Sequence, residues 1–355
     1  MSGTPVASVL DTKAPRVSEK QAQAIAQQHY GLTVIAKPLI GERDSNFHLR
    51  AADGGDYLLK LVNPAEDEAV TDFQTSALLH MAARDPSLPV PRVVETARGE
   101  PYFKLAQRGG TTRIVRLLTY LPGTPLANVE RSPTLPRNLG LGLARLDLAL
   151  SDFSHAASAH ELLWDISHAT RLRPLIRHVE DRERQGLVGL VLDRLEITVL
   201  PRLATLRRQV IHNDFNPSNI LVTGSAEGPQ DRLAGIIDFG DMVEAPLIQE
   251  VGVAASYHVA EEGDFLSPIK LFAAGYHAVL PLQEGEIACL FDLVLARMVQ
   301  SVVIPAWRST LQPGNRDYIL RNAGRAWMGL SRAQAVSPAQ AAEEIHLYLS
   351  RERAP

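Results

Sequence analysis

The feature that most constrains this chain is a pair of apolar segments that each deliver polar side chains to a loop. Residues 210–222 read VIHNDFNPSNILV, and residues 235–241 read GIIDFGD. Short apolar runs bounded by turn-forming residues predict β-strands, so the polar groups should lie beside strand ends and close together. This pattern is typical of a functional site, not of a core. The polar groups are His212, Asp214, Asn219 and Asp238.

Two carboxylates and an amide in this order suit phosphoryl transfer to a hydroxyl. In kinase-type enzymes one Asp orients and deprotonates the acceptor hydroxyl, an Asn further along the loop binds Mg²⁺, and an Asp before Phe-Gly binds the metal that bridges the phosphates. Asp214, Asn219 and Asp238 fill these positions. Carboxylate and amide oxygens are suitable ligands for Mg²⁺. A simpler interpretation stays open at each position, because Asp and Asn also form turns.

The N-terminal part of the chain predicts a β-meander that carries a lysine. We expect strands at residues 32–40, 47–51 and 57–62, with a hairpin turn at residues 53–56. Lys60 alternates with apolar neighbours on the third strand. A lysine is unusual there unless its ammonium reaches a cleft, where it can bind phosphates.

Kinases hold this lysine with an acidic residue on the following helix. That helix is predicted at residues 65–83 and offers three alternatives. Gln74 would be a neutral partner, whereas Glu68 or Asp72 would form an ion pair. The sequence does not choose among them.

These motifs resemble the aminoglycoside phosphotransferase and choline kinase family, small-molecule relatives of the protein kinases whose loop reads His-x-Asp-x-x-x-x-Asn. The resemblance spans about residues 34–327 and is greatest to hydroxylysine kinase and to the kinase-like domain that precedes some aminotransferases. It is carried by residues 44–49 (DSNFHL), 57–60 (YLLK) and 212–214 (HND). Asn213 stands where many members have glycine. This departure is tolerable because the loop needs a backbone shape there more than a side chain.

The resemblance implies an α+β, bilobal, protein-kinase-like fold. Residues 1–17 would be a flexible tail, residues 18–121 an N-terminal nucleotide-binding lobe with a small antiparallel sheet, and residues 122–355 a mainly helical lobe for catalysis and acceptor binding. Helical periodicity and end signals predict the following helices. They are residues 18–28, 65–83, 133–150, 181–205, 248–260, 266–278, 284–301, 315–330 and 338–351.

The resemblance also implies a nucleotide site for ATP or GTP. Lys60, Ser45 and Asn46 would bind phosphates, although a polar hairpin loop at 45–46 would look the same. The strand at residues 112–121 followed by Pro-Gly resembles the hinge between lobes, where main-chain groups near Leu118 and Tyr120 would bind the base. An edge strand and loop are the alternative. His212 would brace the catalytic loop.

The acceptor expected from the resemblance is a small amino alcohol or a hydroxylated amino acid similar to 5-hydroxylysine. Asp241 and Glu244 follow the metal-binding Asp and would face a cationic acceptor. Arg297 and Trp307 would line the pocket, where an amino-acid carboxylate needs an arginine. An aminoglycoside or other small-molecule kinase, or a silent nucleotide-binding pseudokinase, are the alternatives.

Composition excludes other classes of function. A net charge of −4 over 355 residues gives no basic field for nucleic acid. A single cysteine, Cys289, excludes an internal disulfide and fits a reducing compartment. We expect neither a signal peptide nor a membrane helix, since the apolar run at residues 295–306 is too short and contains Arg297. The protein is predicted to be cytoplasmic, without a membrane partner, and a monomer or homodimer.

Three histidines near the middle of the chain are poor candidates for a metal site. Their spacing is irregular, and they lack carboxylate companions. They are His155, His160 and His168.

Overall fold

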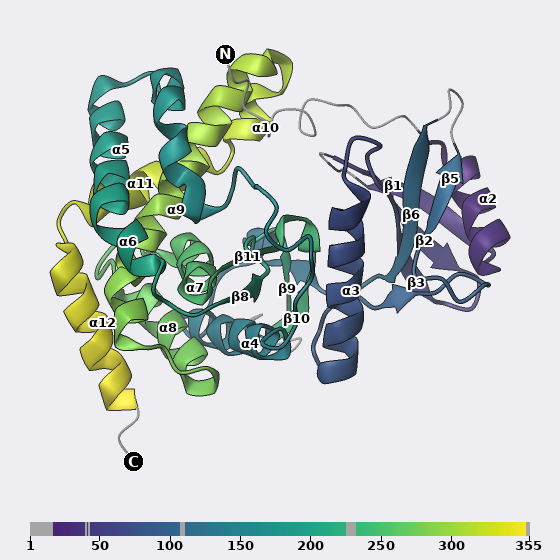
Figure 1. Cartoon of the computed structure of the whole chain (residues 1–355), viewed down its shortest axis with the longest axis horizontal. Helices are drawn as coiled ribbons and strands as arrows, with labels where there is room; N and C mark the ends of the chain where they lie inside the picture. Colours follow the sequence, from purple (N-terminus) through teal and green to yellow (C-terminus); the bar gives the residue numbers. More distant parts are fainter. Residues whose placement is uncertain (1–16, 40, 42, 107–110, 225–231, 353–355) are drawn as a thin grey trace. The chain divides into compact units, whose positions relative to one another are not determined.

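The computed structural model describes residues 17–39, 41, 43–106, 111–224 and 232–352. The predicted tail at residues 1–17 lies outside the described residues except for Val17, which packs against the core of the sheet. The chain forms two units (Figure 1). The first contains the chain up to Gly123 together with His155–Glu161 and Ala234–Ile237, and the second contains Thr124–Ser154, Leu162–Leu233 and Asp238 onward.

The first unit is built on an antiparallel sheet in the order β1-β2-β3-β6-β4, with β5 also paired to β6. The predicted meander and its hairpin are confirmed. The short strand β5 was not predicted, because its four residues alternate too briefly to give a pattern. The strands are β1 (Val34–Leu39), β2 (Ser45–Ala51), β3 (Asp56–Leu61), β4 (Val93–Val94), β5 (Phe103–Ala106) and β6 (Thr112–Thr119).

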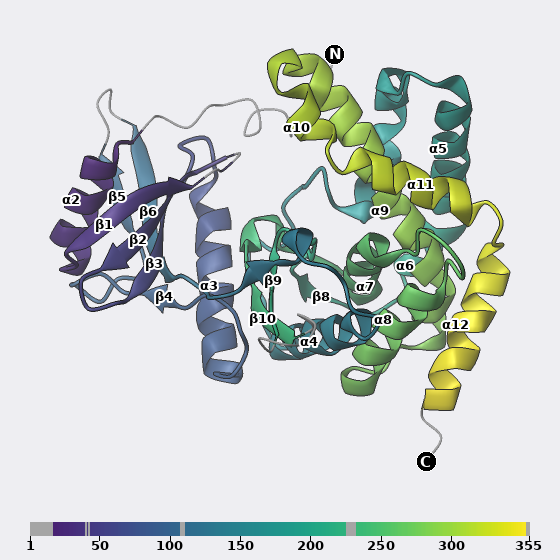
Figure 2. The same cartoon turned by 180° about the vertical axis from the view of Figure 1, so that it is seen from behind.

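Strand alternation separates the two faces of this sheet. Side chains point to opposite faces at successive positions, and the apolar face packs against α2 (Glu19–Tyr30). The residues of that face include Phe47, Leu49, Leu59, Leu61, Val115 and Leu117. The opposite face carries Asn46, Lys60 and Arg116 in one row of the register. Figures 1 and 2 show α3 (Glu68–Arg84) on that side of the sheet, away from α2.

Helix α2 illustrates how local sequence sets an element's ends. Ser18 caps its N-terminus in a capping box with Gln21, whose amide N–H donates to Ser18 Oγ. Gly31 ends the helix with φ of 69°, a left-handed conformation that glycine adopts without strain. The predicted helix is confirmed.

The second unit is mainly helical, as predicted. The predicted helix at 181–205 forms one run in which a π-helical turn, Leu195–Val199, joins α5 to α6. The predicted helix at 315–330 is interrupted between α10 and α11. The helices are α4 (Leu135–Ala149), α5 (Arg182–Arg194), α6 (Leu200–Leu203), α7 (Leu247–Ala255), α8 (Ser267–Val279), α9 (Glu284–Leu311), α10 (Arg316–Leu320), α11 (Ala323–Ala333) and α12 (Pro338–Glu352).

Short strands position the polar loops identified in the sequence. One sheet has the order β10-β9-β7, and a two-stranded sheet pairs β11 with β8. The loop that contains Asp214 joins β8 to β9, and Asp238 follows β10. The turn-rich connection from β9 to β10 falls largely at residues 225–231, outside the described residues. The strands are β7 (Thr124–Pro125), β8 (Arg208–Ile211), β9 (Ile220–Thr223), β10 (Arg232–Ile236) and β11 (Val243–Pro246).

Helix α9 is the core helix of the second unit, and it packs against α7, α11 and α12. It continues past the predicted end at Ser301, and Pro305 lies within it. In length and composition it could span a membrane, which corrects the expectation that the chain has no such stretch. However, 94% of its most apolar window is buried inside the protein, as in the core helix of a soluble protein.

Helices α4 and α8 approach each other at two glycines. A Cβ atom at Gly140 would lie 2.1 Å from the Phe272 carbonyl oxygen, and one at Gly275 would lie 2.0 Å from the Arg137 carbonyl oxygen. Because these contacts are to backbone, the helices must separate to admit a methyl group. We expect Gly140→Ala and Gly275→Ala each to lower the free energy of unfolding by about 1–3 kcal/mol or more, measured by urea denaturation.

A glycine elsewhere in the same unit supplies the control. A Cβ at Gly189 in α5 would meet no atom within 4 Å. Gly189→Ala should therefore raise the free energy of unfolding, by up to about 1 kcal/mol. Equal stability of the Gly140 and Gly189 variants would contradict the close approach of α4 and α8.

Candidate active site

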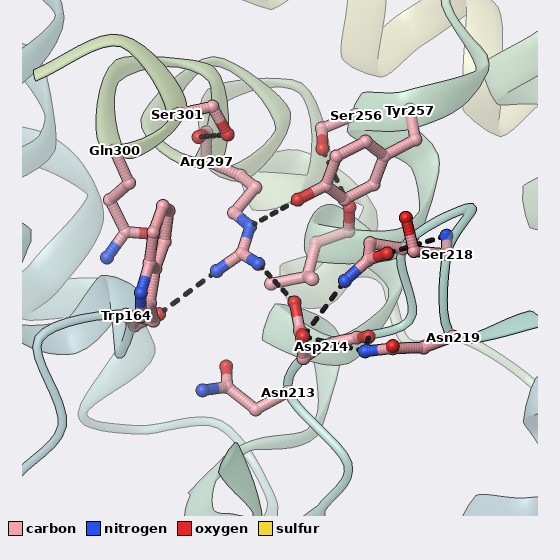
Figure 3. A network of polar contacts seen from close by, with 12 residues as sticks. Trp164, Asn213, Asp214, Ser218, Asn219, Ser256, Tyr257, Arg297, Gln300 and Ser301 are labelled. Atoms are coloured by element: carbon pink, nitrogen blue, oxygen red, sulfur yellow. Dashed lines mark hydrogen bonds and ion pairs between the residues drawn. The ribbon is translucent and has the colours of Figure 1, made fainter. Parts of the chain in front are cut away.

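Asp214 is held by three side-chain donors in the second unit (Figure 3). Its Oδ2 atom accepts hydrogen bonds from Asn216 Nδ2 at 2.9 Å and from Asn219 Nδ2 at 2.8 Å. Its Oδ1 atom accepts one from Arg297 Nη2 at 2.7 Å. A carboxylate oxygen accepts about two hydrogen bonds. Oδ2 is therefore saturated, and Oδ1 keeps the capacity for one further donor, such as an acceptor hydroxyl.

The electrostatic setting of Asp214 suits a proton acceptor near neutral pH. Burial raises its pKa to about 7, the charge of Arg297 opposes this rise, and the negative charges of Asp241 and Asp238 add to it. The Asp214 side chain is 19% exposed to solvent, so a small molecule can reach it. A general base works best when its pKa lies near the operating pH.

Arg297 lies deeper than the carboxylate that it binds. It projects from α9, and its side chain is 2% exposed. The guanidinium lies 4.7 Å from the ring centre of Trp164 and 5.8 Å from that of Tyr257. Its Nε donates to the Tyr257 hydroxyl at 3.2 Å, and Nη1 donates to the Trp164 carbonyl at 3.4 Å. The two rings and these bonds fix the orientation of the cation (Figure 3).

Helix α7 holds the loop between β8 and β9 at its most unusual backbone position. Asn213 has φ of 62°, in the left-handed region where glycine is the usual residue. Its amide N–H donates to Glu250 Oε2 at 2.8 Å, and its side-chain Oδ1 accepts from Gln249 Nε2 at 3.2 Å. Asparagine tolerates this conformation better than most residues, and here its side chain is also bound. These contacts explain how Asn213 replaces glycine.

His212 also supports this loop. Its side chain is fully buried, and its ring meets that of Phe239 edge to face with the centroids 4.8 Å apart. The amide N–H of Asp214 donates to His212 Nδ1 at 3.2 Å. This bond directs the main chain of the candidate base, as the predicted bracing role requires.

Asn219 and Asp238 provide suitable oxygens for a divalent cation. Asn219 directs its Nδ2 to Asp214, which leaves its Oδ1 to coordinate. Asp238 has φ of 60°, and within the described residues only it and Asn213 are non-glycine residues with positive φ. Backbone strain of this kind occurs preferentially at functional sites. In the described part of the chain, no group of three or more His, Cys, Asp or Glu side chains could hold a metal. A cation here would therefore also need oxygen atoms from a bound molecule.

The candidate phosphate-binding groups lie in the first unit. Lys60 Nζ forms an ion pair with Asp44 Oδ2 at 3.4 Å, and Asp44 Oδ1 accepts from the Asn63 amide at 2.9 Å. Asn46 is the register partner of Lys60. Ser45 Oγ accepts from Arg113 Nη2 at 3.2 Å. Asp44 and Asn46 thus place polar side chains beside the lysine at the start of β2.

One acid paired with Lys60 is Asp44, which is not among the three partners that the sequence offered. Gln74 Oε1 accepts from Arg116 Nη2 at 2.7 Å. Glu68 pairs with Lys104, and Asp72 accepts from Tyr102 and His155. A charged neighbour of Lys60 therefore comes from the β1–β2 loop, which sequence analysis did not consider as its source.

The predicted hinge ends strand β6. Leu118 is buried in the sheet, between β3 and β4. The Tyr120 amide donates to the Asp56 carbonyl at 2.9 Å, and the Tyr120 ring stacks on His48 with the centroids 4.2 Å apart. A base bound here would need main-chain groups other than the Tyr120 amide.

Comparison with known proteins decides the family. The model of the APH phosphotransferase enzyme family matches residues 35–284. The chain belongs to this phosphotransferase family. It is an enzyme of the small-molecule kinase class, and the predicted family resemblance is confirmed.

The relatives of this phosphotransferase align over most of its length. Hydroxylysine kinase from Xenopus laevis is 31% identical over 91% of this chain and 91% of the relative. Hydroxylysine kinase from Danio rerio is 30% identical over 90% of this chain and 92% of the relative. Homoserine kinase from Acidiphilium cryptum is 28% identical over 70% of this chain and 73% of the relative.

Solved structures confirm the kinase-like fold. A microcompartment-associated aminopropanol kinase is 18% identical, with a TM-score of 0.63 over 94% of this chain and 98% of that chain. Amicoumacin kinase in complex with AMP-PNP, Ca²⁺ and its ligand is 14% identical, with a TM-score of 0.63 over 86% and 93%.

Two of the predicted acceptor residues of the phosphotransferase, Arg297 and Asp241, interact with Asp214. Asp241 is close enough to raise the pKa of Asp214. Glu244 lies on β11, where its carbonyl accepts from Arg208. Trp307 lies ten residues beyond Arg297 on α9, about 15 Å along the helix axis.

Two aromatic residues at the site were missed. Neither Trp164 nor Tyr257 was predicted as a site residue. Neither belongs to a motif, and only the fold brings their rings to Arg297. The sequence signal that could have found Trp164 is its place after two leucines and directly before Asp165.

The prediction that the three histidines lack carboxylate companions is wrong for two of them, and His155 Nε2 lies 3.1 Å from Asp72 Oδ2. His155 and His160 pack against Phe73 in the first unit. His168 Nε2 lies 3.7 Å from Asp165 Oδ2 in the second unit.

Glu250 should make the stability of the phosphotransferase fall as pH rises. Burial raises its pKa to about 7 from the ordinary 4.5, opposed by hydrogen bonds from the main chain of Asn213 and His212. Between these values the unfolded chain has released the proton while the folded chain keeps it, so the wild type loses stability as pH rises. Glu250→Gln carries no such proton and still offers an amide oxygen to Asn213.

Urea unfolding of wild type and Glu250→Gln between pH 5 and pH 8 measures this effect. We expect the variant to gain stability relative to wild type as pH rises through this range. A stability difference that stays constant with pH would show that Glu250 binds its proton no more tightly in the folded state than in the unfolded state.

Proposed function

We propose that this enzyme transfers the γ-phosphate of ATP, or of GTP, to the hydroxyl of a small amino alcohol or hydroxylated amino acid similar to 5-hydroxylysine. The observation that carries the proposal is the geometry of Asp214. Three donors hold its carboxylate, and Oδ1 retains room for one hydroxyl. A solvent-accessible carboxylate with a raised pKa is suited to accept that proton.

The relatives support this class of acceptor. Hydroxylysine kinase, homoserine kinase and aminopropanol kinase are all named for acceptors that carry an amine and a hydroxyl. Asp241 and Asp238 give the surroundings of Asp214 negative charge, which suits an ammonium group.

In the proposed reaction, the acceptor hydroxyl donates to Asp214 Oδ1 and attacks the γ-phosphorus. Its proton passes to the carboxylate, the bond from the γ-phosphorus to the β–γ bridging oxygen breaks, and the nucleoside diphosphate leaves. The transition state of phosphoryl transfer is loose, so orientation of the hydroxyl contributes more than proton removal. Asn219 and Asp238 would hold Mg²⁺, which neutralises phosphate charge when bound. Lys60 would bind the phosphates through its ammonium.

The test is nucleotide consumption over a panel of acceptors with ATP and with GTP. The panel contains 5-hydroxylysine, homoserine, 3-aminopropan-1-ol, ethanolamine and an aminoglycoside. We expect turnover with one of the first four. Turnover with the aminoglycoside alone would favour an antibiotic kinase, and nucleotide binding without turnover of any acceptor would favour a pseudokinase.

A further inference from the structure

We propose that Arg297 binds a carboxylate of the acceptor, so that the enzyme selects hydroxylated amino acids over amino alcohols. This inference rests on the proposed function and narrows its substrate class. It assigns Arg297 direct contact with the acceptor in addition to its ion pair with Asp214.

Because Arg297 forms an ion pair with Asp214, any acceptor that reaches Asp214 also lies close to the guanidinium. Arg297 Nη2 lies 2.7 Å from Asp214 Oδ1. The reacting hydroxyl must lie within about 3.2 Å of the same carboxylate oxygen to give up its proton. The hydroxyl oxygen is therefore within about 6 Å of the guanidinium, whatever the rest of the acceptor is. A carboxylate a few bonds away from that hydroxyl can reach the guanidinium.

The guanidinium has donors left for such a carboxylate. Arginine carries five N–H groups in a planar fork. Within the described residues, three have partners, which are Asp214, the Tyr257 hydroxyl and the Trp164 carbonyl. Two N–H groups therefore remain. Arginine suits carboxylate binding because its fork matches the two oxygens.

The surroundings keep this fork rigid and nearly dry. Arg297 is 2% exposed, and the rings of Trp164 and Tyr257 lie 4.7 Å and 5.8 Å from the guanidinium carbon. An acceptor without a carboxylate would displace water and leave buried donors without partners. Sites built to hydrogen-bond a substrate group discriminate strongly against analogues that lack it.

The competing interpretation is that Arg297 acts only through Asp214, as a positioning residue. The two interpretations differ in what happens when the acceptor changes. If Arg297 only positions the base, its loss lowers kcat/KM by the same factor for acceptors with and without a carboxylate. If it binds the carboxylate, its loss affects the amino acid much more.

Matched acceptors that differ only in the carboxylate make the test. We would measure kcat/KM for 5-hydroxylysine against 1,5-diaminopentan-2-ol, and for homoserine against 3-aminopropan-1-ol. In wild type we expect the amino acid of the productive pair to be preferred by about 100-fold or more. In Arg297→Gln this preference should fall to near unity, and Arg297→Lys should keep part of it. A wild-type preference near unity, or one that Arg297→Gln leaves unchanged, would overturn the proposal.

A second ion pair on the same helix provides the control variant. Arg194 Nε lies 2.6 Å from Asp292 Oδ1 of α9, outside the Asp214 network. Arg194→Gln removes an arginine–aspartate pair of the same kind, and it should leave the acceptor preference unchanged. If the acceptor preference falls equally in this variant, the loss comes from altered packing of α9, and the proposal is overturned.

A binding measurement separates this inference from the proposed function. L-lysine and cadaverine differ by one carboxylate and lack the hydroxyl, so neither is phosphorylated at that position. We expect L-lysine, but not cadaverine, to raise the Tm of wild type, and Arg297→Lys to weaken the L-lysine effect. Equal shifts by both compounds would overturn the inference while leaving phosphotransfer intact. An enzyme that binds L-lysine in this way but phosphorylates no acceptor would refute the proposed function alone.

Discussion

Replacing Asp238 by alanine is expected to abolish turnover, with a loss of about 1,000-fold or more in kcat. Asp238 is the carboxylate proposed to hold the divalent cation, and its charge contributes to the environment of Asp214. Without it the phosphate charge would lack its counterion, which catalysis by charge neutralisation requires. The measurement is steady-state nucleotide consumption with the best acceptor across a range of Mg²⁺ concentrations.

A second variant separates the charge of Asp238 from its backbone conformation. Asp238 has φ of 60°, which alanine adopts less readily than aspartate or asparagine does. Asp238→Asn keeps a side chain that tolerates this conformation and removes the charge, so it should fold normally and still lose turnover. Asp193, an exposed α5 residue paired with Arg173, gives the control variant Asp193→Ala, which should keep wild-type activity. Wild-type turnover by Asp238→Asn would make the metal assignment wrong.

Asp214→Asn should lower kcat by about 100- to 10,000-fold while sparing nucleotide binding. The amide cannot take the hydroxyl proton, whereas the proposed phosphate-binding residue Lys60 belongs to the other unit. All three neighbours of the carboxylate are donors, so the new NH₂ group must face one of them. We therefore also expect a lower Tm without ligand.

A thermal-shift titration with the nucleotide and Mg²⁺, run beside the activity assay, measures both effects. The shift on saturation should match that of wild type. If the variant turns over acceptor at the wild-type rate, Asp214 is not the base. If it loses the nucleotide-induced shift together with activity, Asp214 contributes to nucleotide binding and the proposed division of roles fails.

Much of the fold could be predicted because local signals decide it. The capping box at Ser18 and the left-handed Gly31 set the ends of α2 from adjacent residues. Alternation along β3 puts Leu59 and Leu61 under α2 and Lys60 on the opposite face. The short apolar runs that carry Asp214 and Asp238 were predicted from their own composition and flanking turns.

The polar partners of the site could not be predicted in the same way. Arg297 was predicted to line the acceptor pocket, but it lies 83 residues from Asp214, and nothing in the helical pattern of α9 indicated their ion pair. Trp164 and Tyr257 belong to segments without a motif. The pairing of Lys60 with Asp44 depends on where the fold places Asp44, directly before β2, whereas the prediction looked for the partner on α3.

The sequence by itself determined the family, the two-part architecture of sheet and helices, and the short loop segments that bear the candidate catalytic groups, because periodicity and motif spacing are local properties. Only the tertiary structure decided which cation meets Asp214, which acid meets Lys60, and how Asn213 is held in a left-handed conformation. Those contacts join distant segments, and they form only when packing of α7 and α9 in the second unit, and of the sheet in the first, removes the alternatives.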